Sequence, residues 1–360
     1  MSLKKEIDEA RLQIHTDSYP MSIGELVNLY EDNELDINPD FQRLYRWNIT
    51  QKSRLIESIF LGIPLPSIFV SQRDDGVWDV VDGLQRIATI LSFMGKLKDM
   101  QDADKKYFEA TKTKYLPSLY GKKWTDLDLE LQRIFKREKI DIKIIKRESE
   151  QNAKFELFQR LNTGGSKLSA QEVRNCLLLM INKSAFEYVK KLSNNPDFLA
   201  TLPISDKKSE EASYEEYVIR YFIQQHPNNE LRANNENIGP YFDEAAINLF
   251  NSDSKFQYEH EEAIFKNTFQ IINKALGEDA FKKYNFKERK YKGPISTPIF
   301  EIMTIIIANK IRQKQKITNE YIEKFSKQAS EEIQMIPDKT RPIEKMRFTL
   351  EIANKLFKND

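Results

Sequence analysis

Residues 77–86 read Val-Trp-Asp-Val-Val-Asp-Gly-Leu-Gln-Arg, and this stretch decides how the N-terminal half of the chain folds. The apolar run that ends at Val81 predicts a strand, and Ser67–Ser71 predicts a partner strand across an Asp-Asp-Gly turn. After Gly83, apolar residues recur at helical spacing through Ile87–Met94. We therefore expect a β-hairpin, a tight turn and a helix in direct succession, with polar residues in the turn.

The turn carries two residues suited to phosphate chemistry, Asp82 and Arg86. Gly83 permits a tight turn, and the backbone N–H groups that open the following helix bind anions well. Arg86 can add a bidentate contact to a phosphate, while Asp82 can hold a cation or position a water. A purely structural interpretation stays open, in which Asp82 is the helix N-cap and Arg86 is a surface residue.

A second polar stretch precedes the hairpin. Residues 38–47 read Asn-Pro-Asp-Phe-Gln-Arg-Leu-Tyr-Arg-Trp, with Arg43 and Arg46 three residues apart among aromatic residues. Arginines in such a setting can bind phosphates while a ring such as that of Trp47 stacks on a base. The alternative is that the aromatic side chains belong to the core and the arginines are solvated.

Two further stretches have polar or basic character. Residues 162–166 read Asn-Thr-Gly-Gly-Ser, where the glycines together with Asn162 can hold a phosphate or a base edge, although a plain helix connection is the alternative. No Gly-Lys-Ser/Thr follows, so this is not a Walker A loop. Residues 281–293 interleave aromatic residues with cations that suit a nucleic-acid surface or a solvated loop. These cations are Lys282, Lys283, Lys287, Arg289, Lys290 and Lys292.

The pattern of apolar residues predicts an α+β fold. An alternating strand over 139–146 and a helix over 150–161 complete a mixed first half. The second half is helical, with helices expected at 169–181, 184–193, 213–225, 239–250, 257–275, 297–314, 317–333 and 341–357. We expect an N-terminal extension (1–20), a mixed α/β domain (21–180) and an all-α domain (181–360), with exposed loops at 233–238 and 286–294.

Composition excludes several classes of protein. The 360 residues are 40% hydrophobic and 31% charged, which is typical of a globular chain. Lys+Arg number 56 and Asp+Glu 55, so the net charge of +1 identifies no partner. We expect no signal peptide, because the first residues are charged, and no membrane span, because the longest apolar run is too short. Cytoplasm is the expected location.

Cysteine and histidine are too few for most metal chemistry. The single Cys176 excludes an internal disulfide and a zinc site made of several thiolates. His15, His226 and His260 lie far apart, without the neighbours that a metal site or a nuclease of the HNH type needs. We therefore expect no metal cluster held by the protein alone and no nuclease activity in this chain.

The motifs together resemble a known family. They occur in the order Phe41–Arg43 with Trp47, Ile63–Pro66, Val81–Arg86, Phe158–Gly165 and Leu168–Arg174. This series is similar to the ParB/sulfiredoxin-like family with an Asp-Gly-Gln-Gln-Arg signature. It resembles the N-terminal part of GmrSD-type modification-dependent restriction enzymes and of phosphorothioate-sensing defence factors. The resemblance covers about residues 20–180.

The resemblance implies a nucleotide-binding domain that can hydrolyse nucleoside triphosphates, with Mg²⁺ as a possible cofactor, in bacterial defence against foreign DNA. Asp82, Gln85 and Arg86 would be catalytic. The matching nucleotide-binding residues would be Gln42, Arg43, Arg46, Trp47, Gly83, Asn162, Thr163 and Gly164. Leu84 departs from the usual Gln of the signature.

Two other functions stay open. The chain can be a DNA-binding module without catalysis, in which Arg43, Arg46 and Arg86 line a groove for a DNA backbone that carries a modification. It can also be a protein-interaction module whose signature is vestigial, as Leu84 suggests. A separate nuclease or effector protein is an expected partner in the preferred interpretation, and the helical half can form a homo-oligomer.

Overall fold

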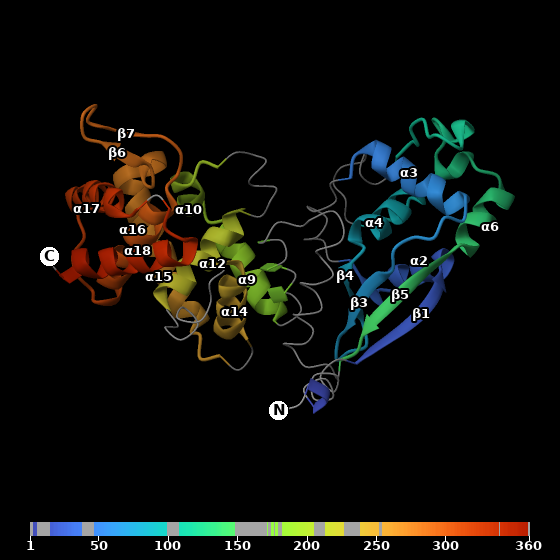
Figure 1. The fold of residues 1–360 in the computed structure, drawn as a ribbon, viewed down its shortest axis with the longest axis horizontal. Coiled ribbons are helices and arrows are strands. Elements are labelled where there is room, and N and C mark those ends of the chain that lie inside the picture. Colours follow the sequence, from blue (N-terminus) through green and yellow to red (C-terminus); the bar gives the residue numbers. More distant parts are fainter. Residues whose placement is uncertain are drawn as a thin grey trace. The chain divides into compact units, whose positions relative to one another are not determined.

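The computed structural model describes most of the chain. The described residues are 3–5, 15–37, 47–98, 108–147, 171, 174–175, 177–178, 182–204, 213–226, 238–251, 254–337 and 339–358. Contacts divide the chain into two compact units, Met1–Lys167 and Leu168–Asp360, called here the N-terminal unit and the helical unit (Figure 1). The domain boundary expected after residue 180 stays a prediction.

A five-stranded sheet forms the centre of the N-terminal unit. Its strands are β1 (Thr16–Ser22), β2 (Leu35–Asp36), β3 (Ile68–Gln72), β4 (Trp78–Asp82) and β5 (Lys139–Ile145). Their order across the sheet is β1-β5-β3-β4-β2, and β1, β5, β3 and β4 can be followed in Figure 1. The β1–β5 and β3–β4 pairs are antiparallel, whereas the β3–β5 and β2–β4 pairs are parallel.

The predicted β3–β4 hairpin is confirmed. Val70 pairs with Val80, and the register shifts between Phe69 and Val70. Such a shift marks a bulge, which bends a strand locally and increases its twist. Strand β4 continues as far as Asp82 and therefore carries this carboxylate to the start of the polar turn.

The pattern of apolar residues did not reveal β1 and β2. All residues of β1 up to Pro20 are exposed, so the strand lacks the apolar alternation that predicts a half-buried strand. Because β1 is an edge strand, it tolerates a proline within its length. Strand β2 is only two residues long and gives no periodicity at all.

The α-helices that accompany the sheet in the described part of this unit include α2 (Ile23–Glu31), α3 (Ile49–Phe60), α4 (Leu84–Phe93) and α6 (Leu129–Arg137). Short 3-10 turns lie at Pro117–Leu119 and Trp124–Asp126. Ser22 caps α2, since its Oγ accepts a hydrogen bond from Glu25 N at 3.2 Å. Asn48 caps α3 through reciprocal hydrogen bonds with Gln51, which leaves Thr50 inside the first turn.

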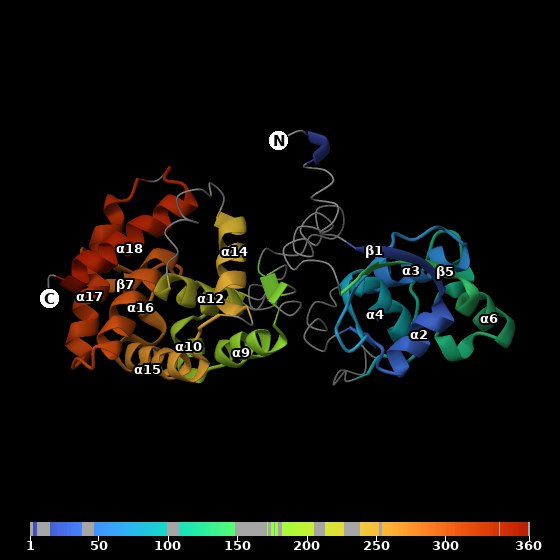
Figure 2. The same ribbon diagram turned by 90° about the horizontal axis from the view of Figure 1, so that it is seen from below.

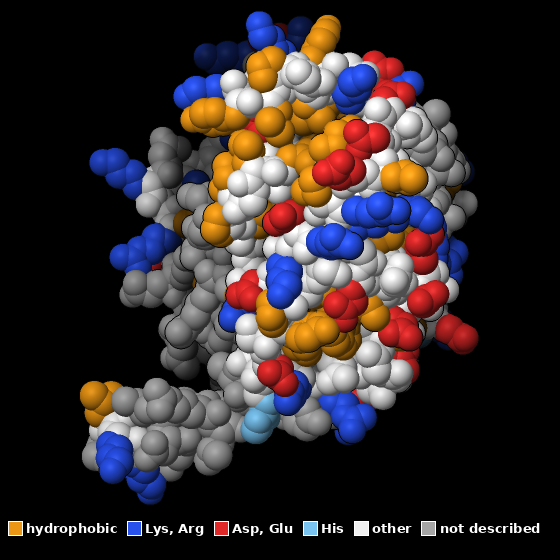
Figure 3. Space-filling view, turned by 90° about the vertical axis from the view of Figure 1, so that its right-hand side faces the viewer, with side chains coloured by type: hydrophobic (Ala, Val, Ile, Leu, Met, Phe, Trp, Pro, Cys, Tyr) orange, Lys and Arg blue, Asp and Glu red, His pale blue; other side chains and the backbone are white. Residues whose placement is uncertain are grey.

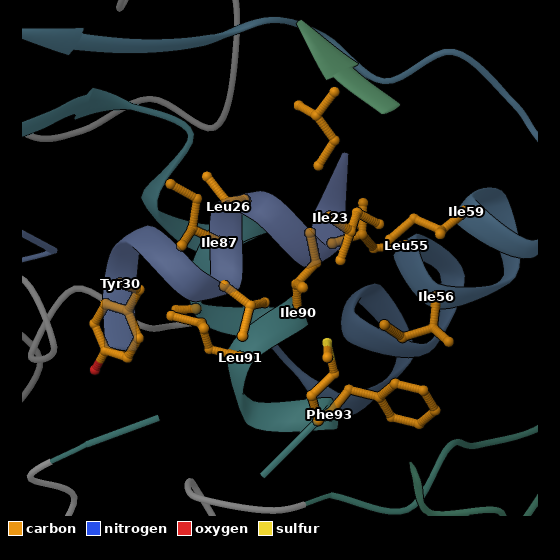
Figure 4. Packing of buried hydrophobic residues seen from close by; sticks show 14 of the residues in the cluster. Ile23, Leu26, Tyr30, Leu55, Ile56, Ile59, Ile87, Ile90, Leu91 and Phe93 are labelled. Atoms are coloured by element: carbon orange, nitrogen blue, oxygen red, sulfur yellow. The ribbon is translucent and has the colours of Figure 1, made fainter. Parts of the chain in front are cut away.

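Helices α2, α3 and α4 pack together in one hydrophobic core. Figure 4 shows Leu26, Ile56, Ile87 and Leu91 pointing toward one another from these three helices. Each side chain is at most 2% exposed, and burial of such a side chain contributes about 1.5–3 kcal/mol. Helix α4 is therefore held firmly along most of its length, which fixes the position of its N-terminus.

The helical unit consists mainly of α-helices. They are α9 (Lys183–Ser193), α10 (Pro196–Thr201), α12 (Ser213–Gln225), α14 (Ile238–Phe250), α15 (Tyr258–Leu276), α16 (Thr297–Arg312), α17 (Asn319–Glu332) and α18 (Pro342–Lys358). Short 3-10 turns lie at Gly277–Asp279 and Ile333–Met335. Helix α16 packs against α12, α15, α17 and α18 (Figure 2). Among the described residues, no helix has the length and apolar character needed to cross a membrane.

The helical unit also contains a two-stranded antiparallel ribbon, β6 (Lys283–Asn285) and β7 (Lys290–Lys292). The prediction of a loop over 286–294 is therefore wrong in part, because each strand is only three residues long and too short to produce a recognisable alternation. The α+β fold class and the helical second half are confirmed. The helix expected over 150–161 lies outside the described residues.

Candidate functional site

The polar turn between β4 and α4 is the centre of the candidate site. Gly83 is the N-cap of α4 and has a left-handed conformation with φ 98°. A Cβ atom at this position would lie 2.8 Å from Ile68 Cγ1, closer than carbon atoms can approach. Both the backbone angle and the close packing therefore require glycine. Asp82 is the last strand residue rather than the N-cap, which corrects the structural interpretation of this residue.

Arg86 joins three segments at this turn. Its Nη2 donates to Asp82 Oδ2 at 2.9 Å, and its Nη1 donates to the carbonyl oxygen of Pro66 at 2.5 Å. The Arg86 side chain is 11% exposed, whereas that of Asp82 is 37% exposed. The guanidinium is thus an internal tie with limited access to solvent, and the carboxylate of Asp82 is the more accessible partner.

Gln85 connects the turn to the segment that follows the second polar stretch. Its Oε1 accepts a hydrogen bond from Trp47 N at 3.2 Å, across 38 positions of sequence. Trp47 is partly buried and packs against the hydrophobic core of the N-terminal unit. The structure therefore brings two of the predicted motifs together through Gln85 and Trp47.

The N-terminus of α4 has no side-chain cap. The amides of Arg86 and Ile87 both donate to the carbonyl oxygen of Gly83, at 3.0 Å each. The first N–H groups of a helix lack intrahelical acceptors and, together with the helix dipole, favour an anion. The turn therefore combines an anion-binding backbone with one accessible carboxylate and one guanidinium that is mostly shielded from solvent.

Several predicted site residues lie outside the described part of the chain. These are Gln42, Arg43, Arg46, Asn162, Thr163 and Gly164. The structure brings together Asp82, Gly83, Gln85, Arg86 and Trp47, and the roles of all these residues stay predictions.

An ion-paired cluster near the other end of the hairpin was missed by sequence reasoning. Arg73, which follows β3, donates through Nε to Asp79 Oδ2 at 2.7 Å and through Nη2 to Asp36 Oδ2 at 2.6 Å. The hydrogen bonds that Arg73 donates to Asp79 and Asp36 raise the pKa of Arg73 despite its partial burial. Because Asp36 lies in β2 and Asp79 in β4, this cluster ties β2 to the hairpin. Local sequence patterns cannot reveal the pair of Arg73 and Asp36, because these residues are 37 positions apart.

Exposed apolar side chains lie on α6, the helix on the side of the N-terminal unit that faces the viewer in Figure 3. Leu129, Leu131 and Ile134 are 67%, 39% and 41% exposed, whereas the neighbouring Phe135 is fully buried. In Figure 3, apolar side chains lie in separate groups between charged ones. Helix α6 is thus anchored mainly through Phe135.

The last motif of the series, Leu168–Arg174, ends in a buried residue of the helical unit. Arg174 is 4% exposed, and its Nε donates to Asp243 Oδ1 at 2.8 Å. Its Nη1 donates to Gln171 Oε1, and its guanidinium lies 5.4 Å from the centre of the Phe242 ring. These contacts indicate that Arg174 stabilises the helical unit.

The six candidate DNA-binding cations lie on or beside the β6–β7 ribbon. Lys282 pairs with Asp279 at 2.8 Å, while Lys290 and Lys292 pair with Glu288 at 2.9 and 3.0 Å. Burial also lowers access to the aromatic residues between them, since Tyr284 and Tyr291 are only partly exposed. The structure therefore brings the cations together on one element, and their binding role stays a prediction.

A comparison with known protein families matches the part of the chain that contains the β4–α4 turn. Residues 23–179 match the family model described as GmrSD restriction endonuclease, N-terminal domain. No curated protein and no solved structure matches the sequence. The match supports a GmrSD-type N-terminal region and indicates a component of a restriction-type defence system. The β4–α4 turn lies within the matched residues.

Proposed function

We propose that the chain binds a nucleoside triphosphate at the β4–α4 turn and hydrolyses it, as a switch of a bacterial restriction-type defence system. One observation carries the proposal. Asp82 and Arg86 meet across a glycine turn at an uncapped helix N-terminus, within the residues that match the GmrSD N-terminal domain. In the resemblance described above, these residues belong to a nucleotide-binding signature.

The phosphates are proposed to bind at the first turn of α4. The backbone N–H groups there favour negative charge, and the mostly shielded Arg86 adds a fixed positive charge close by. Charge that develops on the transferred phosphoryl group is stabilised by such preorganised donors. Because Arg86 Nη2 contacts Asp82, a phosphate that bound this nitrogen would release Asp82.

Asp82 is proposed to position the attacking water or to hold Mg²⁺. Among the described residues, no group of three or more His, Cys, Asp and Glu side chains could hold a metal ion. Mg²⁺ usually binds through one or two carboxylates together with substrate phosphates, so the single accessible carboxylate of Asp82 fits this ion. Bound Mg²⁺ would neutralise charge on the phosphates.

The remaining nucleotide contacts are proposed from the resemblance. Gln85 contacts the backbone of Trp47 and would thereby hold the preceding polar stretch near the turn. The other proposed nucleotide-binding residues are Gln42, Arg43, Arg46, Asn162, Thr163 and Gly164. DNA and a separate nuclease or effector protein are the proposed partners.

The test measures phosphate release from ATP, GTP, CTP and UTP with Mg²⁺, with and without duplex DNA. The variant Asp82→Asn keeps the size of the side chain and removes its charge. Asp74→Asn is the matched control, because Asp74 is exposed in the turn at the other end of the hairpin. We expect turnover of at least one nucleotide by the wild type and the control, and a loss of about 100-fold or more in Asp82→Asn.

Equal turnover in all three proteins would contradict the catalytic role of Asp82. Absence of both turnover and nucleotide binding in the folded wild type, with and without DNA, would contradict the proposed function. Salt-sensitive DNA binding in that case would favour the module without catalysis, because phosphate contacts make affinity fall steeply with salt.

A further inference from the structure

The β6–β7 ribbon has two chemically different faces. Its register pairs Lys283 with Lys292, Tyr284 with Tyr291, and Asn285 with Lys290. Side chains alternate between the two faces of a strand, so the two tyrosines share one face and the lysines share the other. The ribbon, labelled β6 and β7 in Figure 1, lies at an end of the helical unit.

The tyrosine face is anchored to α17. The rings of Tyr284 and Tyr291 lie 5.1 Å apart, and Tyr284 N donates to Ser330 Oγ at 3.0 Å. Lys327 of α17 lies 5.1 Å from the centre of the Tyr284 ring. On the same side, Phe286 and the exposed face of α17 line a groove of about 420 Å³. The lysine face is therefore the outer face of the ribbon.

The outer face concentrates positive charge in a way that opposes strand pairing. Lys283 and Lys292 stand directly opposite each other, and like charges in this position destabilise a pair of strands. Lys287 and Arg289 add two cations in the connecting turn, and neither forms an ion pair with any residue in the described part of the chain. The aromatic face holds the ribbon together despite this repulsion.

One carboxylate offsets little of this charge. Glu288 pairs with Lys290 and Lys292, but all three side chains are at least 39% exposed. Exposed ion pairs of this kind contribute little and exchange readily with other anions. The outer face and its turn therefore present five cations with a single acidic neighbour on the same hairpin.

We propose that the outer face of the β6–β7 ribbon binds the phosphate backbone of duplex DNA. A two-stranded ribbon fits the major groove of B-DNA, and lysines and arginines along it can contact phosphates on either side. The deep and narrow major groove of duplex RNA does not admit such an element, which favours DNA. The groove on the other side is lined by Glu320, Glu323 and Glu331 together with Lys324 and Lys327, so phosphates meet no row of unopposed cations there.

This surface belongs to the helical unit and needs no nucleotide, so its test is independent of the proposed hydrolysis. The full chain is titrated against a short fluorescein-labelled DNA duplex without nucleotide, and fluorescence anisotropy is followed at several salt concentrations. The variant combines Lys283→Gln, Lys287→Gln and Arg289→Gln. The matched control combines Lys316→Gln, Lys339→Gln and Lys358→Gln, three exposed lysines of the same unit outside the ribbon.

The ribbon variant should bind DNA about tenfold or more weakly than the control, and the slope of log affinity against log salt should fall by about three. Because its substitutions are exposed, its circular dichroism spectrum and melting temperature should match those of the wild type. The single Lys287→Gln change, in the turn, should lower the slope by about one.

Two results would overturn the proposal. The first is equal DNA affinity of the ribbon variant and the control, or no DNA binding by either protein. The second is equal binding of a duplex RNA of the same length with equal loss in the variant, which would replace a DNA surface with a general polyanion surface.

Discussion

Asp82 Oδ2 accepts a hydrogen bond from Arg86 Nη2 at 2.9 Å, across the turn that Gly83 makes between strand and helix. The two charges occupy unequal environments, because Arg86 is nearly buried and Asp82 is about one-third exposed. An incoming phosphate would compete with Asp82 for the guanidinium. The hydrogen bond between Asp82 and Arg86 thus stabilises the turn, and the proposed binding of a nucleotide would break it.

Replacement of Arg86 should destabilise the N-terminal unit as well as affect turnover. Arg86→Ala removes bonds to both Asp82 and Pro66, and hydrogen bonds of a charged group contribute about 1.5–3 kcal/mol. Asp82→Asn retains an acceptor for Arg86 and should cost less. Urea unfolding of both variants measures the difference, and an unchanged stability in Arg86→Ala would contradict the role of this residue as an internal tie.

Substitution of Gly83 should be costly for two separate reasons. Gly83→Ala places a Cβ atom 2.8 Å from Ile68 at a φ of 98°, so we expect a loss of about 1–3 kcal/mol or more. Gly76→Ala is the matched control, since Gly76 has a φ of 89° and nothing within 4 Å of the added atom. Thermal and urea unfolding should show a smaller loss in the control, and equal losses would argue against the steric effect.

Two adjacent residues of α6 should differ strongly in their effect on stability. Phe135 is fully buried and packs against Phe60, Phe93 and Trp124 with ring centres 5.2–5.7 Å apart. Phe135→Ala should therefore cost about 3–5 kcal/mol. Ile134→Ala, at a side chain 41% exposed, should change the free energy of unfolding by about 0.5 kcal/mol or less. A large loss in Ile134→Ala would show that this exposed surface is covered in solution.

Glu57 should contribute to the pH dependence of stability. Burial raises its pKa, but hydrogen bonds from the amides of Tyr115 and Leu116 and from Thr113 lower it more, so the pKa lies below its usual 4.5. A depressed pKa in the folded state stabilises the protein above pH 4.5 and loses this effect as pH falls through the folded-state pKa. The stability advantage of the wild type over Glu57→Gln should therefore shrink between pH 5 and about pH 3. Urea unfolding across this range measures it, and a constant difference would contradict the prediction.

Much of the fold was predictable because apolar periodicity marks the elements that bury one face. The β3–β4 hairpin, α4 and the long helices of the second half follow this pattern closely. Strand β1 was not predictable, since its residues are mostly exposed and its pairing with β5 joins positions as distant as Thr16 and Ile145. The cap of α3 is not evident from the sequence, because Asn48 and Thr50 are both good caps and only the reciprocal bond with Gln51 selects Asn48.

The candidate site was predictable only in part. The spacing of Asp82 and Arg86 places both in one turn, but the acceptor at Pro66 and the bond from Trp47 to Gln85 depend on tertiary packing. The strand pairing of the basic segment, which forms the β6–β7 ribbon, was also not predictable. Its tyrosines and lysines lie on opposite faces of a ribbon, and the contacts of Tyr284 with α17 place the tyrosines on the inner face.

The most direct test of the account locates the bound triphosphate. Hydrogen–deuterium exchange is measured for the wild type with and without the nucleotide that it prefers, with Mg²⁺ present. The amides that open α4, led by Leu84, should exchange more slowly when the nucleotide is bound, because its phosphates would accept their hydrogen bonds. Protection elsewhere in the chain, with exchange at this turn unchanged in saturating nucleotide, would contradict the placement of the phosphates at the β4–α4 turn.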